Sequence, residues 1–286
     1  MSVAKWCFVL LLGLLTSFSR CEDSNATLGI EPTAETLPAN FLKFYLHFSE
    51  PMERGDVFRY LSLLKVNPEG TEEEVVEPFR EVELWSADFQ SLTLWLHPGR
   101  QKPGVNLNVD LGPVLAEGSK YRLVVSPEWK TESGGKLAGI LSKTFHAGGS
   151  DLEQPDPSRW SISRLSDQRL LIETDGAVDS SSLRKRLRVM SPFLKGDAQV
   201  GAEVSGNRVI LKAGMKPVVA GRGLRAWDPG PYRIEIDPQL EDLAGNSIAR
   251  LFNLDLEKYP HFVEKTESTH ISFTITESFE VKITSP

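Results

Sequence analysis

The feature that most constrains the fold of this chain is an internal repeat with an offset of 111 residues. Residues 121–129 recur as residues 232–240, and the offset continues without a gap to Gly134 and Gly245. A fixed period of this length indicates one structural unit used twice, and a unit of about a hundred residues has the size of a domain. The repeat therefore predicts two successive copies of one domain.

Within each copy, apolar and polar residues alternate with a period of two. Residues 41–48 place Leu42, Phe44, Leu46 and Phe48 on one side of an extended segment, as expected for a half-buried strand. Further strands are predicted over residues 61–66, 79–85, 92–96, 121–125 and 141–145. The one predicted helix spans residues 180–187, with Ser180 as its N-cap. Many short strands bounded by turn residues predict an all-β chain of two tandem β-sandwich domains.

The remaining segments follow from composition. The predicted organisation is a signal peptide over 1–19, a polar N-terminal spacer over 20–37, a first sandwich over 38–147, a linker over 148–157, a second sandwich over 158–257 and a C-terminal hairpin extension over 258–286. The extension alternates again over residues 271–275 and 279–283. Because an isolated hairpin is only marginally stable in water, it either pairs with the second sandwich or begins a further unit.

The first residues have the pattern of an export signal. Lys5 precedes an apolar run over residues 6–15, and the small residues Ser17 and Ser19 follow it. The run is too short to span a bilayer and is typical of a secretory signal peptide. We expect the mature chain to be exported, to the periplasm, the cell surface or the medium.

Cys21 is the only cysteine after the signal peptide, so a disulfide within the mature chain is not possible. Two interpretations remain open. Cys21 could carry a lipid and attach the chain to a membrane, or it could be a free thiol in an N-terminal tail. Lipoprotein signals place a small residue before the cysteine, whereas this chain has Arg20, which favours the free thiol.

Four sequence segments carry recognisable motifs: residues 48–52 (Phe-Ser-Glu-Pro-Met), 118–125, 231–234 and 240–247, the last containing Asp242-x-x-Gly245-Asn246. Together these segments resemble the bacterial Ig-like domain of S-layer and related surface proteins. The resemblance covers nearly the whole mature chain apart from the spacer and the hairpin. It implies Ig-like sandwiches in a surface context, in which the tyrosine-bearing strand leads into an Asp-x-x-Gly-Asn turn before the last strand.

Each copy departs from the family pattern at one place. The first copy has Thr-Glu-Ser-Gly-Gly over residues 131–135 in place of the Asp-x-x-Gly-Asn turn, and the second lacks the Phe-Ser-Glu-Pro-Met segment. The shared motifs are structural, so the resemblance implies a fold and a location but no chemistry.

No arrangement of residues typical of catalysis occurs in the sequence. The five histidines are scattered, and the chain has no zinc-protease motif, nucleophile elbow or phosphate-binding loop. His47 is expected to point outward into solvent from the first strand. The net charge of −7 argues against a nucleic-acid partner. We therefore predict no enzyme activity, no catalytic residue, no cofactor and no metal ligand.

A calcium site is the one alternative to this prediction, and it would involve Asp237, Asp242 and Asn246. Their oxygen atoms could bind calcium, which prefers carboxylates and carbonyls in turns. The same residues can instead hydrogen-bond the backbone of the turn, with Gly245 supplying a positive φ. The turn is the favoured interpretation.

Two long loops are candidate binding segments, because ordered loops on rigid sandwiches often carry binding. The first spans residues 98–118, and its alternative is a loop folded over the edge of its own domain by apolar residues. These are Val105, Leu107, Val109 and Leu111. The matching loop over residues 217–231 contains Arg222, Arg225 and Trp227. The acidic run at 72–74 and the basic run at 184–186 are expected to be solvated or to protect edge strands.

These observations predict a non-catalytic exported structural or binding module of the bacterial cell envelope or exterior, with an unknown protein or glycan as its partner. The alternative is an accessory component of an exported enzyme system that contacts a polymer or glycan through tryptophans. The candidates are Trp85, Trp95, Trp129 and Trp227. Exposed rings would favour the alternative, and Trp95, which is out of phase with its apolar neighbours, is expected to be the most exposed.

Overall fold

The structure is a computed structural model that describes residues 25–101, 106–191, 200–213, 226–254, 261–278 and 280–284. The signal peptide, Arg20, Cys21, Val105, Arg222 and Arg225 lie outside these residues. None of the helices within the described ranges is long and apolar enough to cross a membrane.

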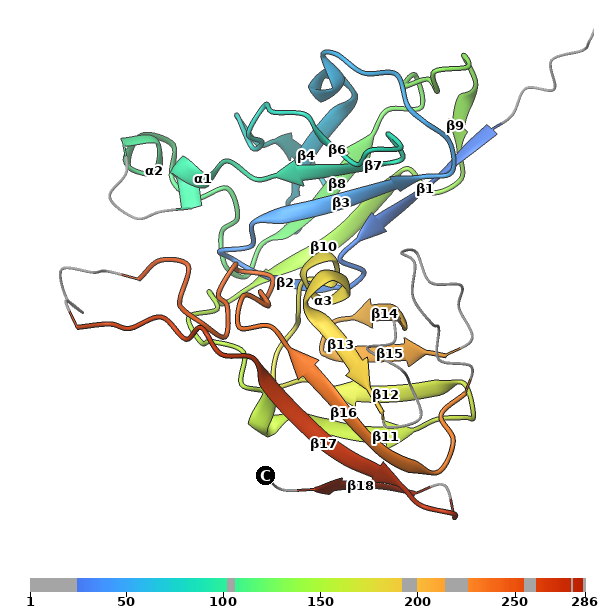
Figure 1. Cartoon of the computed structure of the whole chain (residues 1–286). Helices are drawn as coiled ribbons and strands as arrows, with labels where there is room; N and C mark the ends of the chain where they lie inside the picture. Colours follow the sequence, from blue (N-terminus) through green and yellow to red (C-terminus); the bar gives the residue numbers. More distant parts are fainter. Residues whose placement is uncertain are drawn as a thin grey trace, which may run out of the picture.

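The N-terminal half of the chain forms two five-stranded sheets, which we call the N-terminal sandwich (Figure 1). One sheet has the order β6 (Leu84–Trp85), β7 (Ser91–Trp95), β3 (Lys43–Phe48), β1 (Asn25–Glu31) and β9 (Lys136–Ala138). The other has the order β2 (Thr36–Pro38), β10 (Ser142–Gly148), β8 (Lys120–Val125), β4 (Leu61–Val66) and β5 (Glu72–Glu74). The β1–β9 and β2–β10 pairs are parallel and the others antiparallel.

The C-terminal half forms two four-stranded antiparallel sheets, the C-terminal sandwich. One has the order β11 (Ser161–Arg164), β12 (Arg169–Glu173), β15 (Arg208–Lys212) and β14 (Gly201–Ser205). The other has the order β13 (Leu187–Met190), β16 (Gly230–Ile236), β17 (Thr269–Ile275) and β18 (Val281–Thr284). The order β1-β3-β7 of the first half recurs as β11-β12-β15, and β4-β8-β10 recurs as β13-β16-β17. The predicted all-β fold of two sandwiches is confirmed.

The described helices are short and lie between strands. They are η1 (Val57–Tyr60), α1 (Pro98–Gln101), α2 (Asn106–Leu111), η2 (Pro157–Arg159) and α3 (Ser180–Arg186). The predicted helix over 180–187 is α3, but its N-cap is Asp179 and not Ser180. Asp179 keeps an extended backbone, and its carboxylate accepts a hydrogen bond of 2.7 Å from the Ser182 amide.

Each sandwich has its own hydrophobic core, and the two cores repeat one aromatic pair. Tyr121 on β8 stacks on Phe145 of β10, with ring centroids 5.7 Å apart. Tyr232 on β16 stacks in the same way on Phe273 of β17, at 5.4 Å. All four side chains are buried. Because the same contact joins corresponding strands, the sequence repeat is also a repeat of packing.

The prediction of a polar spacer over residues 20–37 is wrong for its described part. β1 lies within this segment and is hydrogen-bonded to β3 from Leu28 to Glu31. Ala26 is fully buried, and Leu28 and Ile30 pack against the core. These three residues alternate with a period of two, which is a strand signal. Because the residues around them are polar, the segment was interpreted as a spacer.

The predicted C-terminal hairpin forms. Of the two alternatives given by the sequence, it pairs with the second sandwich and does not begin a further unit. β17 pairs with β16 from Gly230 to Ile236, and Ile271, Phe273 and Ile275 are buried in the core. The boundary at residue 257 is therefore wrong, because β17 is the counterpart of β10 and completes the sandwich. The chain between Ala249 and Thr269 is longer than in the first copy, which ends the sequence repeat before this strand.

Candidate functional site

The two sandwiches meet where β3 faces α3, which lies between them in Figure 1. The alternation of β3 predicts one buried face and one exposed face. The structure buries both, because Phe44 and Leu46 enter the N-terminal core while Lys43 and Tyr45 are covered by the C-terminal sandwich. The second face of β3 is thus the centre of the joint between the sandwiches.

A polar cluster is buried in this joint. The Tyr45 hydroxyl donates to the Asp179 carboxylate, with both carboxylate oxygens 3.0 Å from it. Lys43 Nζ lies 2.7 Å from Glu241 Oε2 and 3.7 Å from Asp179 Oδ2. The Asp179 side chain is only 1% exposed and that of Lys43 10%. We call Lys43, Tyr45, Asp179 and Glu241 the joint cluster.

The surroundings of Asp179 and Tyr45 change their acidity. Burial raises the pKa of the Asp179 carboxyl, although the charge of Lys43 and the Ser182 amide oppose the rise. Burial and the neighbouring Asp179 also raise the pKa of the Tyr45 hydroxyl. Tyr45 therefore stays protonated and acts as a hydrogen-bond donor across the joint.

A second set of contacts extends the joint along β1. Glu31 accepts hydrogen bonds from Ser180 Oγ at 2.5 Å and from Arg184 at 2.6 Å, both on α3. Burial alone would raise the pKa of Glu31, but hydrogen bonds with His47, Arg184 and Ser180 outweigh it and hold the pKa at about 2. The His47 side chain, expected in solvent, is 38% exposed and lies 2.9 Å from Ser91 Oγ and 3.3 Å from Glu31.

A backbone contact closes the apolar side of the joint. The Leu42 amide donates to the Leu243 carbonyl at 3.2 Å, and Leu243 packs into the N-terminal core. Gly245 has a φ of +81°, and a Cβ at this position would lie 2.4 Å from Leu42 Cδ1. Glycine is thus required here both by its φ and by the close approach of the two sandwiches.

The predicted turn forms around Asp242. Its Oδ1 accepts hydrogen bonds of 2.8 Å from the Ala244 and Asn246 amides, and its Oδ2 accepts one of 2.9 Å from Asn246 Nδ2. Burial and the charge of Asp151 raise the pKa of Asp242 to about 7, although hydrogen bonds from Asn246 and Ala244 oppose the rise. Both carboxylate oxygens therefore bind within the turn. Asp237 does not join them, since it accepts a hydrogen bond from Arg186 at 2.8 Å.

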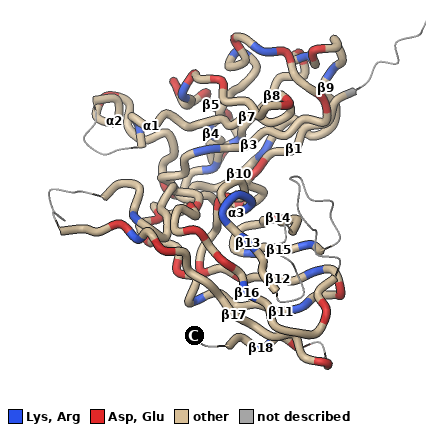
Figure 2. Tube along the Cα trace, in the orientation of Figure 1, with Lys and Arg blue, Asp and Glu red and all other residues tan. Residues whose placement is uncertain are grey.

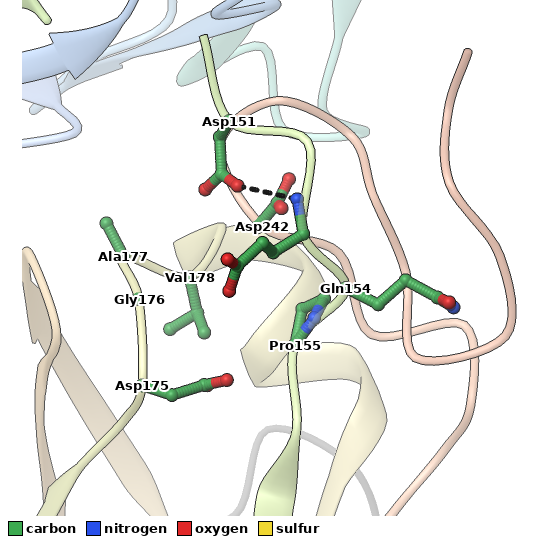
Figure 3. A pocket seen from close by; sticks show the side chains of 9 residues that line it. Asp151, Gln154, Pro155, Asp175, Gly176, Ala177, Val178 and Asp242 are labelled. Atoms are coloured by element: carbon green, nitrogen blue, oxygen red, sulfur yellow. Dashed lines mark hydrogen bonds between the residues drawn. The ribbon is translucent and has the colours of Figure 1, made fainter. Parts of the chain in front are cut away.

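A small pocket lies beside this turn (Figure 3). Asp151, Asp175 and Asp242 line it from different segments of the chain. Asp175 accepts hydrogen bonds from Trp160 Nε1 at 2.8 Å and from Arg159 at 2.6 Å. No group of three or more histidine, cysteine, aspartate or glutamate side chains placed to hold a metal ion occurs among the described residues.

The segment predicted as a linker, 148–157, is bound to both sandwiches next to this pocket. Asn40 Nδ2 donates to the Asp151 carbonyl at 2.7 Å, and the Asp151 amide donates to Asn40 Oδ1 at 2.9 Å. Gln154 Nε2 donates to the carbonyls of Ser247 and Ile248, each at 3.0 Å. The connecting segment therefore adds to the joint instead of separating the sandwiches.

The long loop over 98–118 folds back on its own sandwich, but a charged residue holds it there. Arg100 is 5% exposed and donates hydrogen bonds to the carbonyls of Val76, Leu111, Gly112 and Pro113. The apolar residues expected to do this are partly outside, with Val109 70% and Leu111 41% exposed. The expectation of apolar anchoring is wrong at these two positions, because one guanidinium satisfies four carbonyls at once.

The candidate tryptophans differ in exposure. Trp129 and Trp227 are fully buried, so neither can contact a polymer. Trp85 and Trp95 are partly exposed, and the ammonium of Lys43 lies 5.2 Å from the ring centroid of Trp95. The ring expected to be most exposed is thus partly covered by a residue of the joint cluster.

The two charged runs behave differently. The acidic run is β5, an edge strand whose three residues are exposed, as expected. The basic run lies on α3, drawn in blue between the sandwiches in Figure 2. Arg184 and Arg186 form ion pairs with Glu31 and Asp237, so the expectation of a merely solvated face is wrong for these two residues. Neither the sequence period nor the composition reveals this pairing, because the partners lie far apart in the chain.

Comparisons with known proteins give remote structural likeness only. No family model matches the sequence, and no curated protein matches it. The N-terminal part of the bacterial S-layer protein SbsC is similar with a TM-score of 0.29 and 11% identity, over 74% of this chain and 40% of that chain. Native alpha-2-macroglobulin from Escherichia coli, spanning domains MG0-NIE-MG1, is similar with a TM-score of 0.26 and 13% sequence identity, over 74% of this chain and 66% of that chain. This chain thus spans about two fifths of the S-layer structure, and these scores carry no functional assignment.

Proposed function

We propose that the chain is an exported, non-catalytic structural and binding module of the bacterial cell envelope or exterior. In this proposal two bacterial Ig-like domains, from β1 to β10 and from β11 to β18, are held at one fixed angle and act as a rigid spacer. The chain contacts a membrane only if Cys21 carries a lipid, and its partner is a protein or glycan of the envelope.

The joint cluster is the observation that supports this proposal. Removing a charged side chain from water costs several kcal/mol unless it keeps its partners, so a joint built on such groups resists changes of angle. If the sandwiches swung apart, Lys43 would lose both acidic partners and Asp179 would lose the Tyr45 hydroxyl. Such contacts form at one relative orientation of the two domains and would be lost in a pair of domains that moves freely about a hinge.

The export part of the proposal is tested by fractionating the producing bacterium and measuring the mass of the recovered chain. We expect the chain in the envelope fraction or the medium, with its N-terminus at Arg20, or at a lipid-modified Cys21. Recovery from the cytosol with residues 1–19 intact would contradict the proposal. The matched control is a chain lacking residues 1–19, which should stay in the cytosol.

A glycan-contacting role is the second candidate function. Because Trp129 and Trp227 are fully buried, only two of its four candidate rings, Trp85 and Trp95, are partly exposed. A cationic groove at the β9 end of the N-terminal sandwich supports this role independently.

A further inference from the structure

An open groove lies at the end of the N-terminal sandwich that carries β9. Figure 1 shows β9 far from the C-terminal sandwich. The groove is lined by Arg59 and Tyr60 of η1, Ser126 and Glu128 after β8, and the lysines Lys130 and Lys136. It is thus formed by three segments that are brought together by the fold and is separate from the joint cluster.

Two of these cations face each other. Lys130 and Lys136 form an antiparallel bridge, which places their side chains directly opposite on one face. Both are exposed, and neither forms an ion pair with any described residue. Like charges directly opposite across strands destabilise a sheet. Such a local conflict is expected where a site serves binding instead of stability.

The third cation is held in place by aromatic rings. The Arg59 guanidinium lies 4.6 Å from the Tyr60 ring centroid and donates to the Tyr60 hydroxyl at 2.5 Å. Tyr60 stacks in turn on Trp129, with ring centroids 5.5 Å apart and planes at 9°. The fully buried Trp129 donates from Nε1 to the Glu53 carbonyl at 2.8 Å. The floor of the groove is therefore rigid, and the guanidinium needs little further ordering to bind an anion.

The acidic neighbours restrict which anion fits. Glu128 lines the groove, and Arg59 forms an exposed ion pair with Asp56 at 3.7 Å, which an incoming carboxylate must compete with. A densely charged polymer such as a nucleic acid would be repelled by these two carboxylates. A polymer with spaced carboxylates and hydroxyl groups between them fits better, because Glu128 and Ser126 can hydrogen-bond the hydroxyls. Stacking of a sugar on the Tyr60 ring is hindered, since Trp129 stacks on this ring and the Arg59 guanidinium lies over it.

We propose that this groove binds the carboxylate groups of an acidic polysaccharide through Arg59, Lys130 and Lys136. The inference deepens the binding part of the proposed function and is independent of the rigid joint. In a chain with a net charge of −7, such a groove gives a specific attraction to an acidic glycan that the rest of the surface lacks.

The test is titration calorimetry of the mature chain with sodium polygalacturonate, at low and at physiological salt. We expect binding that weakens as salt rises. The Lys130→Ala/Lys136→Ala variant should lose roughly tenfold or more in affinity, as two ion pairs near 0.7 kcal/mol each would give. The matched control is Lys120→Ala/Lys185→Ala, which removes two exposed lysines elsewhere and should stay within about twofold of the wild type.

A second readout separates binding from folding. Because the opposed lysines repel each other, Lys136→Gln should raise the melting temperature by about 1–2 °C while it lowers affinity. Absence of polygalacturonate binding by the wild type, or equal binding by the double variant, would overturn the inference. Binding of poly-L-glutamate in preference to polygalacturonate would also overturn it, in favour of an acidic protein partner. Each of these outcomes leaves the proposed rigid spacer standing.

Discussion

Replacing Asp179 by alanine is the sharpest perturbation of the joint. The side chain combines three roles: it caps α3 through the Ser182 amide, accepts the Tyr45 hydroxyl across the joint, and lies 3.7 Å from Lys43 Nζ. The alanine side chain makes none of these three contacts and forms no polar contact in their place. The loss is concentrated at one residue that is almost completely buried.

The magnitude follows from these contacts. Loss of an N-cap costs about 1 kcal/mol. An unsatisfied buried hydroxyl on Tyr45 adds about 1–3 kcal/mol. Lys43 keeps Glu241 at 2.7 Å, so the full penalty of an abandoned buried charge does not apply. We therefore expect Asp179→Ala to lower the free energy of unfolding by about 2–4 kcal/mol.

Asp179→Asn is the matched control, measured beside the alanine variant by urea denaturation. Asparagine is a good N-cap and offers an acceptor to Tyr45. Burial already disfavours the charged carboxylate, as its raised pKa indicates. The asparagine variant should therefore lose about 1 kcal/mol or less. An alanine variant as stable as the wild type, or an asparagine variant as unstable as alanine, would refute this reasoning.

Three further predictions concern the turn, the acidity of its carboxylate and the first loop. Gly245→Ala should lower the free energy of unfolding by more than about 2 kcal/mol, because Gly245 has a positive φ and a Cβ there would meet Leu42. The control is Gly134→Ala, since Gly134 has a φ of +86° but nothing within 4 Å of a Cβ. It should cost clearly less when both variants are measured by urea denaturation. The pKa of Asp242 is about 7 in the folded chain and about 3.9 in the unfolded chain. Its contribution to the free energy of unfolding is therefore present below pH ~4 and is lost as pH rises towards ~7. In unfolding curves recorded at these two pH values, Asp242→Asn should remove this loss. Arg100→Met should lower the melting temperature by several degrees, as about 2 kcal/mol implies, since four partly buried backbone carbonyls lose their donor. An unchanged melting temperature would show that water replaces the guanidinium.

The sequence predicted the strands of the repeat well where alternation and turn residues agree. The segment over 61–66 coincides with β4, and Tyr121 and Tyr232 occupy equivalent places. The strands β1 and β17 fell outside the two predicted sandwich ranges, each for a different reason. β1 has alternating apolar residues within polar surroundings, and β17 follows an insertion that ends the 111-residue offset.

The joint cluster could not be predicted in the same way. Lys43 and Tyr45 lie on the face of β3 that a single domain would expose, and polar residues there indicate solvent. Their partner Asp179 lies 134 residues from Tyr45 in sequence, and no periodic pattern links them. Only the relative placement of the two sandwiches makes this face a buried one.

The rigid joint is tested most directly by measuring the distribution of distances between the sandwiches. Spin labels at Glu73→Cys on β5 and Arg233→Cys on β16, in a Cys21→Ser background, place one probe on each sandwich for double electron–electron resonance. The account predicts a single narrow distance for this chain and a broadened distribution once Lys43→Ala and Asp179→Ala are added. A distribution as broad without these two changes as with them would contradict it.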